Sequence, residues 1–397
     1  MKLRQLCFAL IVSLFVLSGF SSQIVSYAFA NSGSIHVVTT ICCAQSGDFG
    51  VYDPAHKLLF VLNNNEGAYC DCLGSVTIIN TTSNTVIKTV NVHAENPMGI
   101  IYVPSNHEVY AGGYVFDGTR IVSKTLGTGY GTFEGYNPSD KLVYDGDGDV
   151  VNTTTNAVVS HLNFSNMEVM NFAYDVADHE VYATAYANTY NSTSGKVTYT
   201  AEVLALKGTK VISVVSFGQN ASFSYLDGND AGFLAYNPYN KYIYVPVNAY
   251  PVDSCCPKSP ANYVALIDAA GNRIVRKIPV PNSEQLFGIK HDPNNNETYV
   301  SDDVNENVYG ISSTSNKVVA TISTGCANYC GSPIFFAYDS VNKDIYATTY
   351  NSTIVISPSN KIVTSINETD AAPNYLVFDK SNSYVYSIAE TVTVISS

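Results

Sequence analysis

Charged residues are scarce in this 397-residue sequence, and basic residues are the scarcer kind. Asp, Glu, Lys and Arg make up 13% of the chain, and 33 acidic side chains against 20 Lys and Arg give a formal net charge of −13. Because binding to phosphates needs a basic face, this balance argues against a nucleic-acid partner. The acidic excess is explained by solubility or by an affinity for cations.

Tryptophan is absent, and no long stretch shows the 3.6-residue periodicity of an amphipathic helix. Tyr is abundant instead, with 30 residues, and Tyr, Val, Ile and Thr all favour strands. Since 46% of the residues are hydrophobic, the chain can bury a sizeable core. These features predict an all-β protein.

A long apolar run occurs near the N-terminus, from Leu6 to Phe20, and it follows two basic residues. Ala28-Phe29-Ala30 then offers a small-x-small cleavage motif. Residues 1–30 are therefore predicted to be a signal peptide, and residues 31–397 the mature domain. The sequence leaves open whether this leader is cleaved or kept as an anchor. No later segment is apolar enough to span a membrane, so we expect a secreted or cell-surface protein.

Eight cysteines fall in the mature chain, and export together with an even number favours disulfides over free thiols. The disulfide candidates are Cys42, Cys43, Cys70, Cys72, Cys255, Cys256, Cys326 and Cys330. We expect local pairing of Cys326 with Cys330 and pairing between the first two clusters, although sequence alone does not determine the connectivity. A soft-metal site is the alternative, weakened by the absence of His from the cysteine clusters.

Eight Asn-x-Ser/Thr triplets fit an exported and glycosylated surface. The glycosylation candidates are Asn80, Asn152, Asn163, Asn191, Asn220, Asn296, Asn351 and Asn367. Such triplets also arise by chance in a chain rich in Asn and Thr, so they support the expectation of export without carrying it.

One pattern recurs eight times: an aromatic residue, then Asp or Asn, often Pro, and a second Tyr or Phe seven residues after the Asp or Asn position. The positions that start each copy are Asp53, Val103, Asn137, Asp175, Asn237, Asp292, Asp339 and Asp379. Asp or Asn can form an Asx-turn, and Pro presets a turn and ends a strand. The two aromatic residues are therefore expected on the two arms of a hairpin, which we name strands a and b.

A second pattern follows each hairpin, with an Asn-containing turn leading into β-branched residues, as in Asn84-Thr85-Val86-Ile87 and Asn316-Lys317-Val318-Val319. It predicts a fourth strand, d, and a short apolar run before it predicts strand c. Four strands per repeat make a propeller blade. We therefore predict a single β-propeller of four-stranded antiparallel blades, eight by count, with seven as the alternative.

The two ends of the chain predict how the ring closes. The last repeat stops after strand c, near Ile395, and lacks strand d. The segment Ile35–Ile41 resembles the strand d segments of other repeats. The N-terminal strand is therefore expected to complete the C-terminal blade, which leaves no open sheet edge in the ring.

The strand b endings Tyr299-Val300-Ser301-Asp302, Tyr182-Ala183-Thr184 and Tyr346-Ala347-Thr348 resemble the YVTN-type β-propeller repeats of archaeal and bacterial surface-layer and secreted proteins. The resemblance covers essentially the whole mature chain. It implies an extracellular scaffold or binding role and brings no catalytic motif. Propellers of this type are often seven-bladed, which is the reason for keeping seven blades as the alternative.

In such a ring the a–b and c–d turns share one face, and the b–c loops share the other with the connections between blades. The three longest insertions, 63–74, 185–200 and 248–262, are expected to be b–c loops. All eight mature cysteines are expected on the same face. Binding residues concentrate on loops of this kind, so this face is the expected binding surface.

Two acidic segments are the strongest candidates for a cation site. Asp145, Asp147 and Asp149 alternate with Gly, which suits either a hairpin turn or Ca²⁺ ligation, and the turn is the favoured interpretation. Asp302, Asp303 and Glu306 form a second acidic run, which we expect to be a solvated rim.

The favoured function is a binding or scaffold module at the cell surface that acts through the loop-rich, cysteine-bearing face. We expect a monomer with a protein or glycan partner, no cofactor other than calcium and no catalytic residues. The alternative is a propeller enzyme, similar to lactonases, lyases or quinone-dependent dehydrogenases, with a site at the mouth of the central channel. Ionisable side chains from several blades would have to converge at that mouth.

Overall fold

The structure is a computed structural model that describes residues 35–42, 47–63, 73–95, 97, 99–124, 133–164, 166–191, 196–223, 233–249, 262–325, 335–368 and 373–397. The predicted signal peptide, residues 1–30, lies outside these ranges. All described strands belong to one compact unit, Ser34–Ser397.

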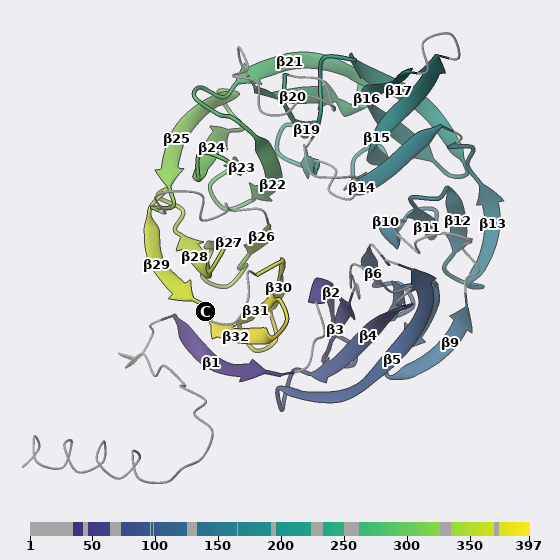
Figure 1. Ribbon diagram of the computed structural model, residues 1–397, viewed down its shortest axis with the longest axis vertical. Coiled ribbons are helices and arrows are strands. Elements are labelled where there is room, and N and C mark those ends of the chain that lie inside the picture. The colour runs from purple at the N-terminus through teal and green to yellow at the C-terminus, as the bar shows by residue number, and fades with distance from the viewer. Residues whose placement is uncertain are drawn as a thin grey trace, which may run out of the picture. The chain divides into compact units, whose positions relative to one another are not determined.

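Eight four-stranded antiparallel sheets stand around a central axis, as Figure 1 shows. This confirms the predicted propeller and its eight blades. We number the blades in chain order and keep the letters a to d from the axis outward.

Blades 1 to 4 follow one another without a break in strand order. They are β2 (Gly47–Asp53), β3 (Leu58–Asn63), β4 (Leu73–Asn80) and β5 (Thr85–Glu95); β6 (Ile100–Val103), β7 (Glu108–Ala111), β8 (Tyr114–Asp117) and β9 (Arg120–Lys124); β10 (Phe133–Asn137), β11 (Leu142–Asp145), β12 (Asp149–Asn152) and β13 (Ala157–His161); β14 (Met167–Asp175), β15 (Glu180–Asn191), β16 (Lys196–Lys207) and β17 (Lys210–Gly218).

Blades 5 to 8 complete the ring, and the last blade takes its outer strand from the N-terminal end. They are β18 (Ala235–Asn237), β19 (Tyr242–Val247), β20 (Tyr263–Asp268) and β21 (Arg273–Pro279); β22 (Leu286–Asp292), β23 (Glu297–Asp302), β24 (Asn307–Ser312) and β25 (Lys317–Ser323); β26 (Phe336–Tyr338), β27 (Ile345–Thr348), β28 (Ser352–Ile356) and β29 (Ile362–Asn367); β30 (Tyr375–Asp379), β31 (Tyr384–Ile388), β32 (Val392–Ser396) and β1 (His36–Ile41).

The pairing of β1 with β32 joins the two ends of the chain (Figure 1). It is antiparallel and runs from His36 opposite Ser396 to Ile41 opposite Val392. Ile41 is buried in the cluster between blades 8 and 1, and Val37 packs against the cluster between blades 7 and 8. The N-terminal strand therefore contributes both hydrogen bonds and apolar contacts to the seam.

The a–b turns have the chemistry that the repeat predicts. In seven blades the side-chain Oδ1 of the starting Asp or Asn accepts a hydrogen bond from the backbone N–H two residues on, as between Asp339 and Val341 at 2.7 Å. Val103 in blade 2 has no such group. The fourth residue after this position has a positive φ of 56–71° in all eight blades. A common turn therefore sets the register of every hairpin.

The second aromatic residue of each repeat is fully buried, and in six blades its hydroxyl connects the blade to the next one. In Tyr299 the hydroxyl donates to Oδ1 of Asn360, the left-handed residue of the next blade's c–d turn, at 2.8 Å. The same arrangement joins Tyr110 to Asn156, Tyr182 to Asn272, Tyr244 to Asn316 and Tyr386 to Asn84, and Tyr144 uses the carbonyl of Gly208. The Asn of the second sequence pattern is therefore the hydrogen-bond acceptor for the Tyr of the first sequence pattern in the preceding blade.

Two blades depart from this arrangement for a structural reason. Phe60 of blade 1 faces the c–d turn of blade 2, which is only Gly118 and Thr119, and Phe needs no partner there. Tyr346 of blade 7 faces blade 8, whose strands c and d come from opposite ends of the chain. Its hydroxyl is buried without a hydrogen-bond partner among the described residues.

This difference predicts unequal effects of the same substitution. Tyr346→Phe should change the free energy of unfolding by less than about 0.5 kcal/mol, whereas Tyr299→Phe should lower it by about 1 kcal/mol because Asn360 and Asn295 lose their partner. Urea denaturation of the two variants and the wild type measures both values. Equal losses would contradict the assignment.

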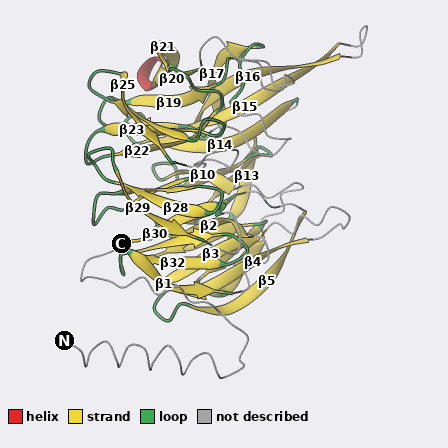
Figure 2. Cartoon of the chain, turned by 60° about the vertical axis from the view of Figure 1, so that its left-hand side comes forward, coloured by secondary structure: helices red, strands yellow, loops and turns green. Residues whose placement is uncertain are grey.

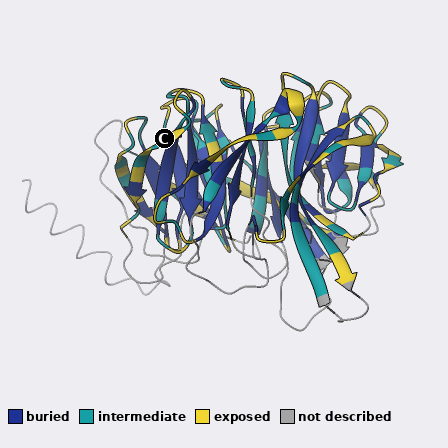
Figure 3. Cartoon of the chain, turned by 90° about the horizontal axis from the view of Figure 1, so that it is seen from above, coloured by how far each residue is buried: buried dark blue, intermediate teal, exposed yellow. Residues whose placement is uncertain are grey.

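The prediction of a b–c loop for the insertion 185–200 is wrong, because most of this insertion is paired strand. Strands β15 and β16 pair from Val181 opposite Leu206 to Asn191 opposite Lys196, so the insertion is an extended hairpin that projects from one face of the ring (Figure 3). The central parts of the other two insertions, 64–72 and 250–261, lie outside the described residues.

Helix is nearly absent from the described residues, where Figure 2 shows strands joined by loops and a single turn of 3₁₀-helix, η1 (Ala269–Gly271). No helix among the residues that the structure describes has the length and hydrophobicity needed to cross a membrane.

Candidate functional site

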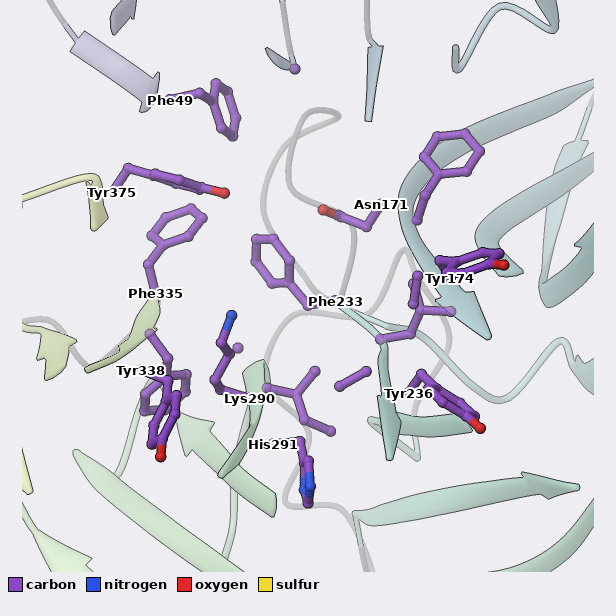
Figure 4. Close-up of a pocket in the computed structure, with 18 of the residues that line it drawn as sticks. Phe49, Asn171, Tyr174, Phe233, Tyr236, Lys290, His291, Phe335, Tyr338 and Tyr375 are labelled. Carbon is purple, nitrogen blue, oxygen red and sulfur yellow. The ribbon is translucent and has the colours of Figure 1, made fainter. Parts of the chain in front are cut away.

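A cavity of about 720 Å³ lies on the axis of the ring and is the candidate site (Figure 4). Its walls come from the innermost strands of seven blades, β2, β6, β14, β18, β22, β26 and β30, and from residues just before some of them. Pro238 and Pro293, which belong to a–b turns, also line it. The cavity therefore reaches the face that carries the a–b turns.

Aromatic rings form the most continuous part of the wall. Ring centroids are 5.1 Å apart for Phe335 and Tyr375, 5.2 Å for Phe233 and Phe335, and 5.7 Å for Phe49 and Tyr375. These four residues come from blades 1, 5, 7 and 8, and Figure 4 shows them around one side of the opening. Each stands four residues before the starting Asp or Asn of its repeat.

Lys290 brings a positive charge into this wall. It stands two residues before Asp292, where the other repeats have Val51, Ile101, Gly135, Ala173, Ala235, Ala337 and Val377. Its amine points toward the open centre, between Phe335 and Phe233 (Figure 4). The side chain is exposed inside the cavity but is surrounded by protein, and this burial lowers the pKa of the amine.

His291 follows Lys290 but turns the other way, as successive residues of a strand do (Figure 4). Burial lowers the pKa of His291 to about 4, and Lys290 contributes to the lowering, so the imidazole is neutral at physiological pH. His291 stands where the other seven repeats have Tyr or Phe, and its side chain is half-buried.

The cavity residues are ones that the sequence analysis missed. The aromatic residues four places before the repeat start, and the Lys at a position otherwise held by small or aliphatic residues, were both visible in an alignment of the eight repeats. Their position on the cavity wall could not be inferred, because the repeat pattern alone does not show which face of the inner strand points to the axis.

Comparison with known proteins supports the fold and leaves the family open. No family model matches the sequence, and no curated protein matches it. A solved structure of the Dos1 propeller is similar over 91% of this chain and 95% of that chain, with a TM-score of 0.65 and 9% sequence identity. At this identity the likeness shows the β-propeller fold alone.

The segment Asp145–Asp149 forms the b–c turn of blade 3, as the favoured interpretation predicts. Asp145 is fully buried and its Oδ1 accepts a hydrogen bond from the N–H of Asp149 at 2.7 Å. Oδ2 of Asp145 and of Asp147 are buried without a hydrogen-bond partner among the described residues. No group of three or more His, Cys, Asp or Glu side chains in the described ranges is arranged to hold a metal ion, and Ca²⁺ binding here stays a prediction.

The burial of Asp145 predicts a pH effect. Burial raises the pKa of Asp145 to about 7, well above the ordinary value of an aspartate, so near pH 6 the folded chain keeps a proton that the unfolded chain releases. The stabilisation from this proton is complete below the unfolded pKa and is lost as the pH rises through about 7. Asp145→Asn, which cannot ionise, should be more stable than wild type by about 4 kcal/mol at pH 8 and within about 1 kcal/mol of it at pH 4.

Chemical denaturation of the wild type and of Asp145→Asn at pH 4, 6 and 8 measures this effect. If added Ca²⁺ stabilises the wild type at pH 8 and not Asp145→Asn, the calcium prediction gains support. A stability difference that does not vary with pH would contradict the proton at Asp145.

The expected solvated rim at Asp302, Asp303 and Glu306 is wrong. Asp302 and Glu306 are buried. The connection that leads into β22 folds over Asp302, and Thr324, which follows β25, hydrogen-bonds to the carbonyl of Glu306. Asp302 accepts hydrogen bonds from the backbone N–H groups of Glu284 and Gln285 at 3.1 and 3.0 Å. Its role is to hold the chain that enters the strand carrying Lys290.

The remaining candidates are only partly placed. Cys42 is exposed, and the other seven disulfide candidates lie outside the described residues. The glycosylation candidates Asn163, Asn220, Asn351 and Asn367 are exposed, whereas Asn80, Asn152 and Asn296 are half-buried. The side chain of Asn191 lies outside the described set.

Proposed function

We propose that this protein is a secreted or cell-surface binding module, of the YVTN-type propeller repeat kind, that takes its ligand into the central cavity. The observation that carries the proposal is the cavity itself, which is open, aromatic and within the 300–1,000 Å³ that is common for small-molecule sites. We place the ligand on the axis and leave the loop-rich, cysteine-bearing face as a surface for protein or glycan partners.

The composition of the wall favours binding over catalysis. Tyrosines aside, the ionisable side chains among the described lining residues are Lys290 and His291, which come from one blade, and His291 turns away. A hydrolytic or lyase-like site would draw acid and base groups from several blades. The geometry of the described wall therefore supports the binding module.

Export is the part of the proposal that the sequence supports. The predicted signal peptide, the paired clusters of cysteines and the sequons all suit an extracytoplasmic protein. Expression with the full leader followed by N-terminal sequencing tests it, and a mature chain that starts at Asn31 is the expected result. Intact-mass measurement without reductant then counts the disulfides.

Binding in the cavity is tested with 2-naphthamide, a flat uncharged molecule, by isothermal titration calorimetry. We expect one site per chain, weakened by Phe335→Ala and unaffected by Tyr350→Ala, which removes an aromatic side chain that is 61% exposed. Absence of binding, or equal loss in both variants, would count against the cavity as the binding site.

A further inference from the structure

We propose that the central cavity is selective for small anions with a flat apolar body, and that Lys290 binds the acidic group, which is a carboxylate or an acid of similar shape. This inference rests on the proposed function, because it takes the cavity as the binding site. It adds the chemical class of the ligand and the residue that recognises its charge.

The aromatic wall determines the apolar part of the ligand. Phe335 contacts Phe233, Tyr375 and Phe49 in tilted or edge-to-face geometry, with centroid distances of 5.2, 5.1 and 6.5 Å. Phe287 extends the cluster behind Phe233, with centroids 5.6 Å apart. Faces and edges of rings in this arrangement suit stacking with another flat ring.

Lys290 determines the charged part. The described residues that line the cavity include no Asp or Glu, and none of the ion pairs in the described part of the chain involves Lys290. An ammonium group in such a site lacks the compensation that a protein carboxylate normally provides. A ligand anion would supply the missing charge and a charge-assisted hydrogen bond.

The placement of Lys290 makes a purely structural role a poor explanation. The seven equivalent positions hold Gly, Ala, Val or Ile, so the fold does not need a long or charged side chain there. The surrounding protein disfavours the charged form of the amine and so lowers its pKa. An anion beside the amine would favour the charged form. The hydroxyl of Tyr375 and the amide of Asn171 also point toward the centre, where they can contact a polar group of the ligand (Figure 4).

The test compares 2-naphthoate with 2-naphthamide, which have the same flat body and differ in charge. The wild type should bind 2-naphthoate about tenfold more tightly by isothermal titration calorimetry. Lys290→Met should remove this preference while keeping affinity for 2-naphthamide, and Lys290→Arg should retain it. Lys317→Met, on the outer strand of the same blade, is the matched control and should behave as the wild type.

The outcomes separate this inference from the proposed function. Equal affinity of the wild type for both probes would overturn the selectivity for anions and leave the cavity as a binding site. A preference for 2-naphthoate that survives in Lys290→Met would overturn the role of Lys290. Failure of the wild type to bind either probe would overturn the proposed site and, with it, the inference. Circular dichroism and melting temperature confirm that each variant is folded.

Discussion

A chain that begins after Ile41 should fail to form a stable monomeric ring. Without β1 the outer edge of β32 loses its pairing from Val392 to Ser396, and the seam loses the buried Ile41 and the packing of Val37. Lost hydrogen bonds and lost apolar burial together should lower the free energy of unfolding by more than about 5 kcal/mol. The open edge should also cause association between chains.

Urea denaturation and size-exclusion chromatography with light scattering measure both effects. The matched control begins at Ile35, so that it lacks the residues before the first blade strand and keeps β1. We expect the control to unfold in a single transition as a monomer. A shorter chain that is monomeric and has the same denaturation midpoint as this control would show that β1 is dispensable.

Asp302→Ala should be the most damaging single substitution among the acidic residues. The Asp302 carboxylate accepts five hydrogen bonds, from the N–H groups of Glu284, Gln285 and Asn305, the amide of Asn305 and the hydroxyl of Tyr309. Ala would leave the buried groups of Gln285 and Tyr309 without partners. The expected loss is about 3 to 5 kcal/mol of unfolding free energy.

Glu390→Ala is the control, because Glu390 is an exposed acidic residue and its loss should cost less than about 0.5 kcal/mol. Asp302→Asn keeps one acceptor oxygen and should fall between the two. The assignment would fail if Asp302→Ala unfolded at the same urea concentration as Glu390→Ala.

The ring was predictable from sequence because its signals are local. An Asx-turn depends on one side chain and the backbone two residues away, as in Asp339 and Val341. The Asn with positive φ in the c–d turn is similarly local, as at Asn316 and Asn360. Eight repetitions of local chemistry were therefore enough to count blades and to find the strand that was missing from the last one.

The site was not predictable in the same way because its signals are long-range. Phe49 and Tyr375 are far apart in sequence and meet only when the ring closes. Asp302 looked solvated because its partners, Glu284 and Gln285, arrive from a connection that the acidic run does not reveal. Lys290 is unusual only after the eight repeats are aligned and the axis is located.

The hydroxyl of Tyr346 has a consequence for where a ring of this kind can be opened. Strands β32 and β1 are not joined by the c–d turn that this tyrosine would otherwise use, whereas the turn at Gly118 and Thr119 faces Phe60, which has no hydroxyl. A circular permutant that joins residues 397 and 35 through a short Asn-containing linker, and starts at Thr119, would give every tyrosine of the series an acceptor. The opening between β32 and β1 is thus at a costlier place in the circle than the sequence repeats require.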